Sequence, residues 1–404
     1  MSRLHVPPPA LRRRPRPVQT DITPARRKVV MLSLALGAFA LGTTEFAAMG
    51  LLPLIAGDLG VTEDQASAVI SAYALGVVLG APGVAALTAR QPRRRLVIVL
   101  LAVIVAGNAL SVMAGSFPVL LGARFLAGIP HGAYFSVAML STASMSPPKE
   151  RGRALAFVVT GLTVATIFGV PAAQAVGDAV GWKAAFGIVA GLAAVALALL
   201  WVVMPHMTLM PATSLRTEFS ALANRQVWLT LAIGVVGFGG MFAVYTYITW
   251  VMTDRAGLGA GWMWLILMLF GLGMTAGNWL GGRLADWNVE RGLVLCVGLL
   301  CISLLAFYFA STAVVPAIVT FMFIGVFGMA LQPPLQVRLL DYAGKAQTLA
   351  AALNQSALNT ANAAGAALGG AVVGAGWGYG SPALAGAVLA AIAVGIWALA
   401  QRAR

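Results

Sequence analysis

Long runs of apolar residues, separated by short polar segments, form the pattern of this chain. About 20 consecutive apolar residues are enough to cross the hydrocarbon of a bilayer as a helix. Twelve runs of about this length lie at roughly 29–56, 66–88, 96–114, 118–145, 154–177, 184–204, 227–252, 262–285, 292–310, 314–336, 347–375 and 382–400. Hydrophobic residues make up 60% of the chain and charged residues 9%, which is unlike a soluble globular domain. We therefore predict an all-α membrane protein with twelve transmembrane helices.

The twelve runs divide into two groups of six. A longer polar connection separates the groups, and the loop Gly282-Arg-Leu-Ala-Asp286 after the eighth run matches Ala85-Ala-Leu-Thr-Ala89 after the second. Duplicated halves with a site between them are a common plan of secondary transporters. We predict two pseudo-symmetric six-helix bundles, with parts at 1–28 (disordered basic tail), 29–204 (N-terminal bundle), 205–226 (cytoplasmic linker) and 227–404 (C-terminal bundle).

The positive charges are distributed as in a membrane protein. The formal net charge is +14, and 23 of the 26 Lys and Arg residues fall in the two tails and in the even-numbered connections between runs. The other side holds only Lys183 and Arg255. This asymmetry follows the positive-inside rule and predicts an inner-membrane protein with both termini in the cytoplasm. It argues against a nucleic-acid partner, and the basic tail can reach anionic lipid head groups.

Outside the loops, two permanent charges remain in the apolar runs, Glu45 in the first and Arg124 in the fourth. An ionisable group at that depth normally faces a bundle interior or a wet cavity and marks an ion or proton route. Residue counting places both at similar depth, so we expect them to be partners. We interpret Glu45 as the group that takes up and releases a proton, with Arg124 balancing its charge. The alternative is a structural ion pair between two helices.

His131 lies on the same face of the fourth run as Arg124. An imidazole is suited to relaying protons near neutral pH. A lone histidine beside a proline can equally be a hydrogen-bond donor to a neighbouring helix. Proton relay and structural donor are therefore both open interpretations.

Amide and aromatic side chains on otherwise apolar faces predict a site for a neutral or amphipathic molecule. Binding pockets are mostly apolar with a few placed polar groups. The candidates are Tyr245 in the seventh run, Asn354 and Asn359 in the eleventh, Met49 on the face of Glu45, and Phe135 on the face of Arg124. The alternative is interhelical hydrogen bonding, which contributes only about 0.6 kcal/mol on average.

Several short motifs occur in the order expected of one transporter family. Leu120-Leu-Gly-Ala-Arg124-Phe-Leu-Ala-Gly128 lies in the fourth run. Gly161 with Gly169-Val170-Pro171 lies in the fifth, as a degraded motif that lacks an adjacent Gly-Pro pair. Thr43-Thr-Glu45-Phe and Asn354-Gln-Ser-Ala-Leu-Asn359 lie in the first and eleventh. Together they resemble the major facilitator superfamily, in its twelve-span drug:proton antiporter branch, and more narrowly arabinose-efflux permeases and chloramphenicol exporters. The resemblance implies a role in proton coupling for the arginine of the fourth-span motif, Arg124.

The family also has a loop signature, G-x-L-A-D-R, in which an acid and arginines lock adjacent helix ends on the cytoplasmic side. The loop after the eighth run is similar to it, whereas the first-half copy has Ala89 in place of the acid. The resemblance implies gating roles for the residues Arg283, Asp286, Arg93 and Arg94. We call this lock between helix ends the latch, and its acid is then present only in the second half.

We predict a monomeric secondary transporter that sits in the lipid bilayer and exports a small-molecule substrate in exchange for protons. The substrate class is a chloramphenicol-like drug, a sugar or a nucleoside. Proton symport, facilitated uniport and a membrane sensor or scaffold remain alternatives. An enzyme would need a nucleophile with a base or a metal cluster, and the histidines stand apart at His5, His131 and His206. We expect no catalytic residue, no cofactor and no metal.

Overall fold

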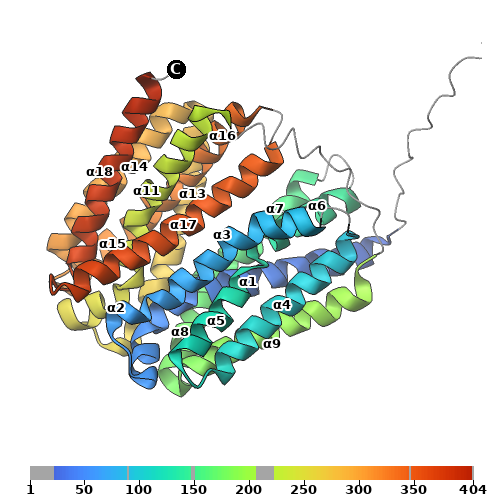
Figure 1. Ribbon diagram of the computed structural model, residues 1–404, viewed down its shortest axis with the longest axis horizontal. Helices are drawn as coiled ribbons and strands as arrows, with labels where there is room; N and C mark the ends of the chain where they lie inside the picture. The colour runs from blue at the N-terminus through green and yellow to red at the C-terminus, as the bar shows by residue number, and fades with distance from the viewer. Residues whose placement is uncertain (1–21, 89–90, 147–150, 206–222, 345–346, 403–404) are drawn as a thin grey trace, which may run out of the picture.

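The computed structural model describes residues 22–88, 91–146, 151–205, 223–344 and 347–402, and every regular element in these ranges is a helix (Figure 1). The N-terminal half contains α1 (Pro24–Leu59), α2 (Glu63–Ala66), α3 (Ala68–Thr88), α4 (Arg93–Met113), α5 (Phe117–Gly128), α6 (His131–Met145), α7 (Arg151–Val164), a π-helical turn (Ala165–Gly169), α8 (Val170–Val180) and α9 (Trp182–Val203). The C-terminal half contains α11 (Arg225–Thr246), α12 (Ile248–Trp250), a second π-helical turn (Val251–Arg255), a 3-10 turn (Ala260–Trp262), α13 (Met263–Trp287), α14 (Val289–Ala310), α15 (Val314–Ala330), α16 (Gln332–Ala343), α17 (Gln347–Gly374) and α18 (Ser381–Arg402). Each predicted run lies on one helix or on a broken series of helices. Within the described ranges, nine helices are long and apolar enough to cross a membrane.

Prolines accompany the breaks in three of the predicted runs. The fourth run is divided into α5 and α6 at Pro130, the fifth has its π-helical turn next to Pro171, and the tenth is divided into α15 and α16 just before Pro333. Proline removes one helical hydrogen-bond donor and clashes with the preceding turn, so a helix bends or stops there. At the first of these breaks a new helix begins with His131.

Two helices begin inside the segments that the pattern assigns to the tail and the linker. α1 begins at Pro24 because the hydroxyl of Thr23 accepts a backbone hydrogen bond at 3.3 Å and because proline suits the first helical turn. α11 begins at Arg225, where the Asn224 side chain accepts a backbone hydrogen bond at 2.9 Å. Residues 1–21 of the predicted tail and 206–222 of the predicted linker lie outside the described residues.

Two arginines cap the C-terminal end of α9. Arg26 donates from Nε to the carbonyl of Val203 at 2.8 Å, and Arg94 donates from Nη2 to the carbonyl of Trp201 at 2.7 Å. The last carbonyls of a helix have no partner inside it and carry partial negative charge, so cations stabilise that end. Arg94, a predicted gating residue, therefore joins α4 to α9 in this structure.

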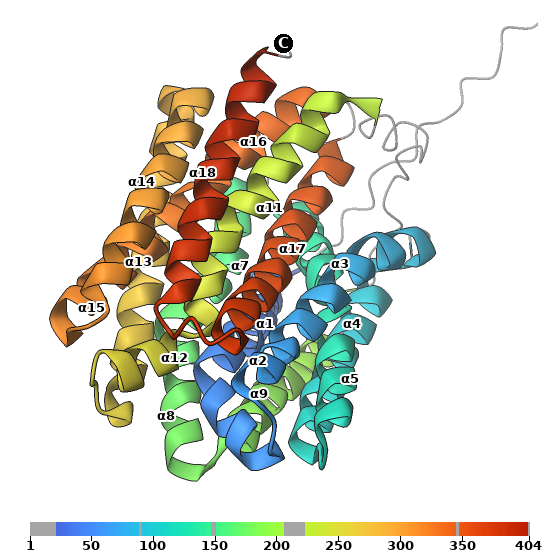
Figure 2. The same cartoon turned by 60° about the vertical axis from the view of Figure 1, so that its left-hand side comes forward.

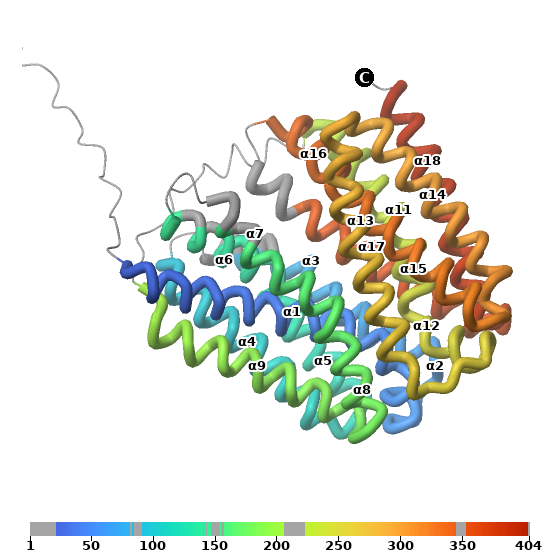
Figure 3. Tube along the Cα trace, turned by 180° about the vertical axis from the view of Figure 1, so that it is seen from behind, coloured from blue at the N-terminus to red at the C-terminus, as the bar shows by residue number. Residues whose placement is uncertain are grey.

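The two halves form a V (Figures 1 and 3). We call the side where α1 begins and α18 ends the terminal face, and the side where α1 ends the opposite face. The halves diverge towards the terminal face and meet towards the opposite face. In Figure 2, α14, α15 and α18 lie on one side and α3, α4 and α5 on the other.

Hydrogen bonds between the halves gather near the opposite face. Thr249 donates from its hydroxyl to the carbonyl of Gly50 at 3.0 Å. Tyr247 donates to the carbonyl of Glu63 at 3.1 Å, and Tyr379 donates to the carboxylate of the same residue. These contacts tie α12 and the segment before α18 to α1 and α2, so the V is joined at this end.

A buried ion pair holds together the C-terminal half near the terminal face. Arg338 on α16 is 1% exposed and donates from Nε to Glu290 Oε1 at 2.9 Å and from Nη2 to Gln226 Oε1 at 3.0 Å. The indole of Trp397 donates to Glu290 Oε2 at 2.8 Å. These bonds connect α11, α14, α16 and α18. The sequence pattern counts Arg338 among the connection charges, but the structure buries it because Glu290 neutralises its charge.

We expect Arg338→Ala to lower the free energy of unfolding by roughly 2–4 kcal/mol, because it leaves Glu290 without its opposite charge in a largely buried place. Thermal denaturation in detergent measures this as a lower midpoint. Arg291→Ala is the matched control, since Arg291 is an exposed arginine near the same face. Equal midpoints for the two variants would contradict the prediction.

Candidate functional site

Glu45 lies in the interior of α1, and 5% of the residue is exposed. No donor among the described residues forms a hydrogen bond with its carboxyl. Oε2 lies 3.8 Å from Nε2 of His131, the first residue of α6. This is longer than a hydrogen bond but close enough for electrostatic interaction. The break at Pro130 therefore brings an imidazole to a buried acid on another helix.

Arg124 and Glu45 do not form the ion pair that was the structural alternative for these two residues. Its side chain is wholly buried, and it donates from Nη1 to Thr44 Oγ1 at 2.8 Å and from Nη2 to the Thr44 carbonyl at 2.7 Å. Its guanidinium lies over the rings of Tyr73 at 4.6 Å and Phe186 at 4.9 Å. Arg124 thus binds the residue before the acid rather than the acid itself, and its charge acts on Glu45 through space.

Tyr73 on α3 is a member of this site that the sequence analysis missed. Its hydroxyl oxygen lies 2.8 Å from Nδ1 of His131, and the two rings meet edge to face at 88°. Tyr73 is the only aromatic residue in the second apolar run, which is the signal that could have pointed to it. We call Glu45, Tyr73, Arg124 and His131 the polar site.

Asn108 on α4 helps to hold Arg124 in place, a role that the sequence analysis did not predict. The hydroxyl of Thr44, which accepts from Arg124, donates to Asn108 Oδ1 at 2.6 Å, and Asn108 Nδ2 donates to the carbonyl of Ile104 at 2.9 Å. Thr44 and Asn108 are both 0% exposed. This chain of buried hydrogen bonds restrains Nη1 and Nη2 of the arginine, whose Nε has no partner among the described residues.

Three predicted substrate-binding residues adjoin the polar site. Met49 is fully buried, one turn beyond Glu45 on α1, and Phe135 lies against the imidazole of the polar site with ring centroids 5.4 Å apart. Tyr245 on α11 stacks on Phe46, the residue after Glu45, at 6.1 Å. The contact between Phe46 and Tyr245 therefore joins the helix of Glu45 to the other half of the molecule.

Tyr245 belongs to an aromatic cluster, which we define as Phe46, Tyr245, Phe270, Phe307 and Phe321. Ring centroids are 4.5 Å apart for Tyr245 and Phe270 and 4.2 Å apart for Phe270 and Phe321. The sequence analysis missed its phenylalanines because they do not stand out in apolar runs. The cluster spans both halves, and each of its residues is 5% exposed or less.

Asn354 and Asn359 lie on α17 and form no hydrogen bond with the polar site. Asn354 donates from Nδ2 to Gln336 Oε1, and Asn359 donates from Nδ2 to the carbonyl of Gln355 at 3.0 Å. Within the described ranges, the side-chain oxygens of both and the two polar atoms of Asn362 have no partner, although the three residues are only 1–2% exposed. Buried polar atoms without partners cost free energy. These three amides are therefore buried with hydrogen-bonding capacity that no described residue meets.

The predicted gating residues of the second half lie exposed at the end of α13. Asp286 makes no hydrogen bond or ion pair with any described residue, and the guanidinium of Arg283 lies 3.7 Å from the ring centroid of Trp279. In the first half Arg93 is half-buried at the start of α4, and Ala89 lies outside the described residues. The latch that the resemblance implies is therefore not formed by Asp286 in this structure, in which the halves diverge on this face.

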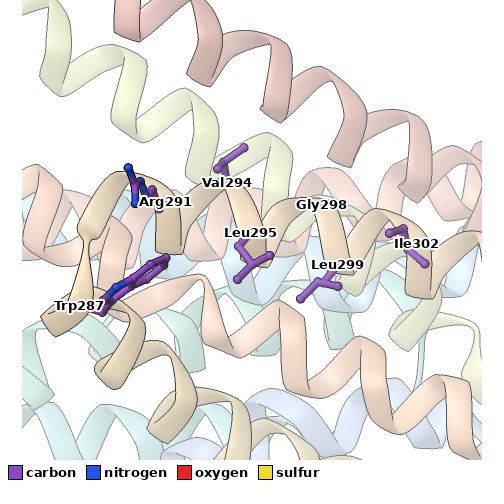
Figure 4. Close-up of a pocket in the computed structure, with 7 residues that line it drawn as sticks. All are labelled: Trp287, Arg291, Val294, Leu295, Gly298, Leu299 and Ile302. Carbon is purple, nitrogen blue, oxygen red and sulfur yellow. The ribbon is translucent and has the colours of Figure 1, made fainter.

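A hollow of about 420 Å³ lies on the outside of α14 (Figure 4). Its lining is almost wholly apolar and consists of Trp287, Arg291, Val294, Leu295, Gly298, Leu299 and Ile302. Trp287 is the last residue of α13, and the other side chains lie on the face of α14 away from its buried residues Leu293, Val297 and Leu300, so the hollow belongs to the outer apolar surface. Elsewhere in the described ranges, no group of three or more His, Cys, Asp or Glu side chains is placed to hold a metal ion.

Comparisons with known proteins point to one family. The family model described as "Major Facilitator Superfamily" matches residues 34–347. The "Inner membrane transport protein YdhP" of Escherichia coli is 38% identical over 364 residues, covering 90% of this chain and 94% of the relative. A "Chloramphenicol resistance protein" of Streptomyces lividans is 35% identical over 366 residues, covering 89% and 93%. The crystal structure of a bacterial homologue of the human lysosomal transporter Spinster, inward-facing and unoccupied, matches with a TM-score of 0.75 at 16% identity, covering 94% of this chain and 98% of that one.

Proposed function

The chain belongs to the major facilitator superfamily, and on that premise we propose that it is a proton-coupled antiporter that exports a small molecule by alternating access. Proteins of this superfamily are multi-pass membrane transporters of small molecules and are not enzymes. The predicted fold of helical bundles is confirmed by the family and by the solved transporter structure. The proposal adds the coupling ion, the direction of transport and the kind of substrate.

The contact between Glu45 and His131, 3.8 Å apart and both buried, carries the proposal of proton coupling. An acid inside a membrane span is costly unless it has a function or a partner, and Arg124 is already engaged with Thr44. Taking up one proton changes the charge of the polar site by one unit beside the fixed charge of Arg124. A change of this size next to the helices of both halves can favour one conformation over the other, which is the requirement for coupling.

The aromatic cluster and the unpaired amides of α17 support a neutral or amphipathic substrate. Ring faces suit a flat apolar part, and Asn359 and Asn362 can pair with hydroxyl or amide groups. The names of two relatives agree with export of such molecules. One is the chloramphenicol resistance protein of Streptomyces lividans, and the other is a "Probable sugar efflux transporter" of Helicobacter pylori, 29% identical over 341 residues.

We assign the terminal face to the cytoplasm, as the distribution of Lys and Arg predicts, and the chain to the inner membrane as a monomer. The V is then open to the cytoplasm and joined on the outer side. An exporter must collect its substrate from the cytoplasm, and this arrangement suits that step.

The test uses purified protein in liposomes with an imposed pH gradient and a panel of candidate substrates that includes chloramphenicol, sugars and nucleosides. We expect at least one compound to move against its own gradient in exchange for protons. A protonophore should abolish that accumulation. Movement that depends only on the compound's own gradient would overturn antiport in favour of uniport, and movement in the direction of the protons would favour symport.

We expect Asp286→Asn to move the population towards the inward-open state by up to about fivefold, because a solvent-exposed charge contact contributes roughly 0.2–1 kcal/mol. The latch would form only when the halves close on the terminal face, and Asp286 is unbonded in this open form. Distances between spin labels at the terminal-face ends of α3 and α13 measure the two populations. Asp341→Asn, another exposed acid on this face, is the matched control. Identical distance distributions in wild type and Asp286→Asn would refute the latch.

A further inference from the structure

Tyr73 contacts two other members of the polar site at once. Its hydroxyl lies 2.8 Å from Nδ1 of His131, while its ring lies under the guanidinium of Arg124 at 4.6 Å. Tyr73 is 1% exposed and His131 is 2% exposed. A buried hydroxyl and a buried imidazole must each find a hydrogen-bond partner, and here they find one another.

The position of Tyr73 is determined by close contact of two backbones. A Cβ atom on Gly128 of α5 would lie 2.1 Å from the carbonyl oxygen of Tyr73, and one on Gly76 of α3 would lie 2.2 Å from the carbonyl oxygen of Phe125. Only glycine at both positions allows α3 and α5 to touch in this way. The phenol is therefore held at the break between α5 and α6, where His131 begins.

The hydrogen bond to Nδ1 has a consequence for the other nitrogen of the ring. A neutral imidazole carries one proton, on Nδ1 or on Nε2, and the bond that one nitrogen makes decides the state of the other. When the phenol donates to Nδ1, the proton resides on Nε2. That nitrogen is the one that faces Glu45 at 3.8 Å.

We propose that Tyr73 is a positioning residue for proton coupling, whose hydroxyl holds the Nδ1 side of His131 so that Nε2 with its proton faces Glu45. The inference rests on the proposed function, in which Glu45 takes up the coupled proton. The ionisable groups around the imidazole are Glu45 on α1, Tyr73 on α3 and Arg124 on α5, and Tyr245 on α11 interacts electrostatically with Glu45. Without the phenol hydroxyl the ring can adopt either tautomer, so uptake of the proton by Glu45 follows a different pH dependence.

The first test observes the tautomer directly. Histidine labelled with ¹⁵N in the full-length protein in detergent distinguishes Nδ1–H from Nε2–H, and comparison with His131→Asn identifies the signal among the three histidines. We expect the Nε2–H form in wild type. In Tyr73→Phe we expect the ratio of the two tautomers to change by about fivefold, the effect of one lost buried hydrogen bond. The same ratio in both proteins would overturn the inference.

The second test compares two tyrosines in transport. Tyr134→Phe is the matched control, because Tyr134 is also wholly buried and its hydroxyl donates to the carbonyl of Leu34 at 2.8 Å, away from Nδ1 of His131. We expect Tyr73→Phe to shift the pH profile of proton-driven exchange and to lower its rate about fivefold, with unchanged substrate affinity. The control should keep the wild-type pH profile. Equal shifts in both variants would show a general packing effect and overturn the inference.

Glu45→Gln, measured in the same assay, separates the two proposals. If that variant loses proton-driven exchange and Tyr73→Phe keeps the wild-type profile and tautomer ratio, the positioning role fails and the proposed function stands. If Glu45→Gln keeps full proton-driven exchange, both fail.

Discussion

Glu45→Gln is expected to reduce pH-gradient-driven transport to background while substrate affinity stays unchanged. Glutamine has the shape of glutamate and forms hydrogen bonds, but it cannot take up a proton. Glu45 is 5% exposed and has no hydrogen-bond donor among the described residues, so the exchange removes little packing. The variant should therefore separate binding from coupling.

Two assays on reconstituted protein measure this separation. The first follows uptake driven by a pH gradient, and the second follows exchange of labelled for unlabelled substrate at equal pH, which needs no net proton movement. The Gln variant should fail in the first and keep activity in the second. Asp178→Asn is a control for loss of a carboxylate elsewhere, since Asp178 lies at the opposite-face end of α8 and is bonded to Gln174 at 2.9 Å. Full gradient-driven uptake by Glu45→Gln would remove this residue as the coupling group.

Arg124→Ala is expected to lose most transport and to change the pH dependence of what remains. The substitution removes two hydrogen bonds to Thr44, at 2.8 and 2.7 Å, and the cation that lies over Tyr73. It also removes the positive charge that acts on Glu45. Each buried charge-assisted hydrogen bond contributes about 1.5–3 kcal/mol, so we expect a fall of at least about a hundredfold in rate.

Two further variants distinguish a role in coupling from a role in packing. Arg124→Lys keeps the charge but loses the paired donors and the flat guanidinium, so it should retain the wild-type pH optimum at a reduced rate. Arg338→Ala removes an equally buried arginine from the other half and should lower thermal stability without moving the optimum. An unchanged optimum in Arg124→Ala would show that this residue and Glu45 do not couple.

The helical segments could be predicted from the sequence because the cost of exposing polar backbone to lipid depends on the segment alone. A run of about 20 apolar residues therefore predicts a spanning helix without knowledge of its neighbours. The positions where a helix breaks inside an apolar run are harder to predict from the pattern. The division at Pro130 decides the site, because it makes His131 the start of a new helix.

The candidate site could be predicted in part. Glu45, Arg124 and His131 were found because charged and titratable residues stand out in apolar runs. The sequence predicted that Glu45 and Arg124 lie at similar depth but not which atoms the arginine binds, since residue counting gives depth along a helix but not the direction in which a side chain reaches. The arginine reaches the residue before the acid instead.

By itself the sequence determined which segments are helices and that an acid, an arginine and a histidine lie inside them, because each of these depends on residues local to one segment. Only the tertiary structure decided which side chains meet. Tyr73 reaches His131 because Gly76 and Gly128 let two backbones touch, and Tyr245 reaches Phe46 because the halves close on the opposite face. The rotation and separation of packed helices arise from contacts between segments far apart in the chain, and no pattern within one segment contains them.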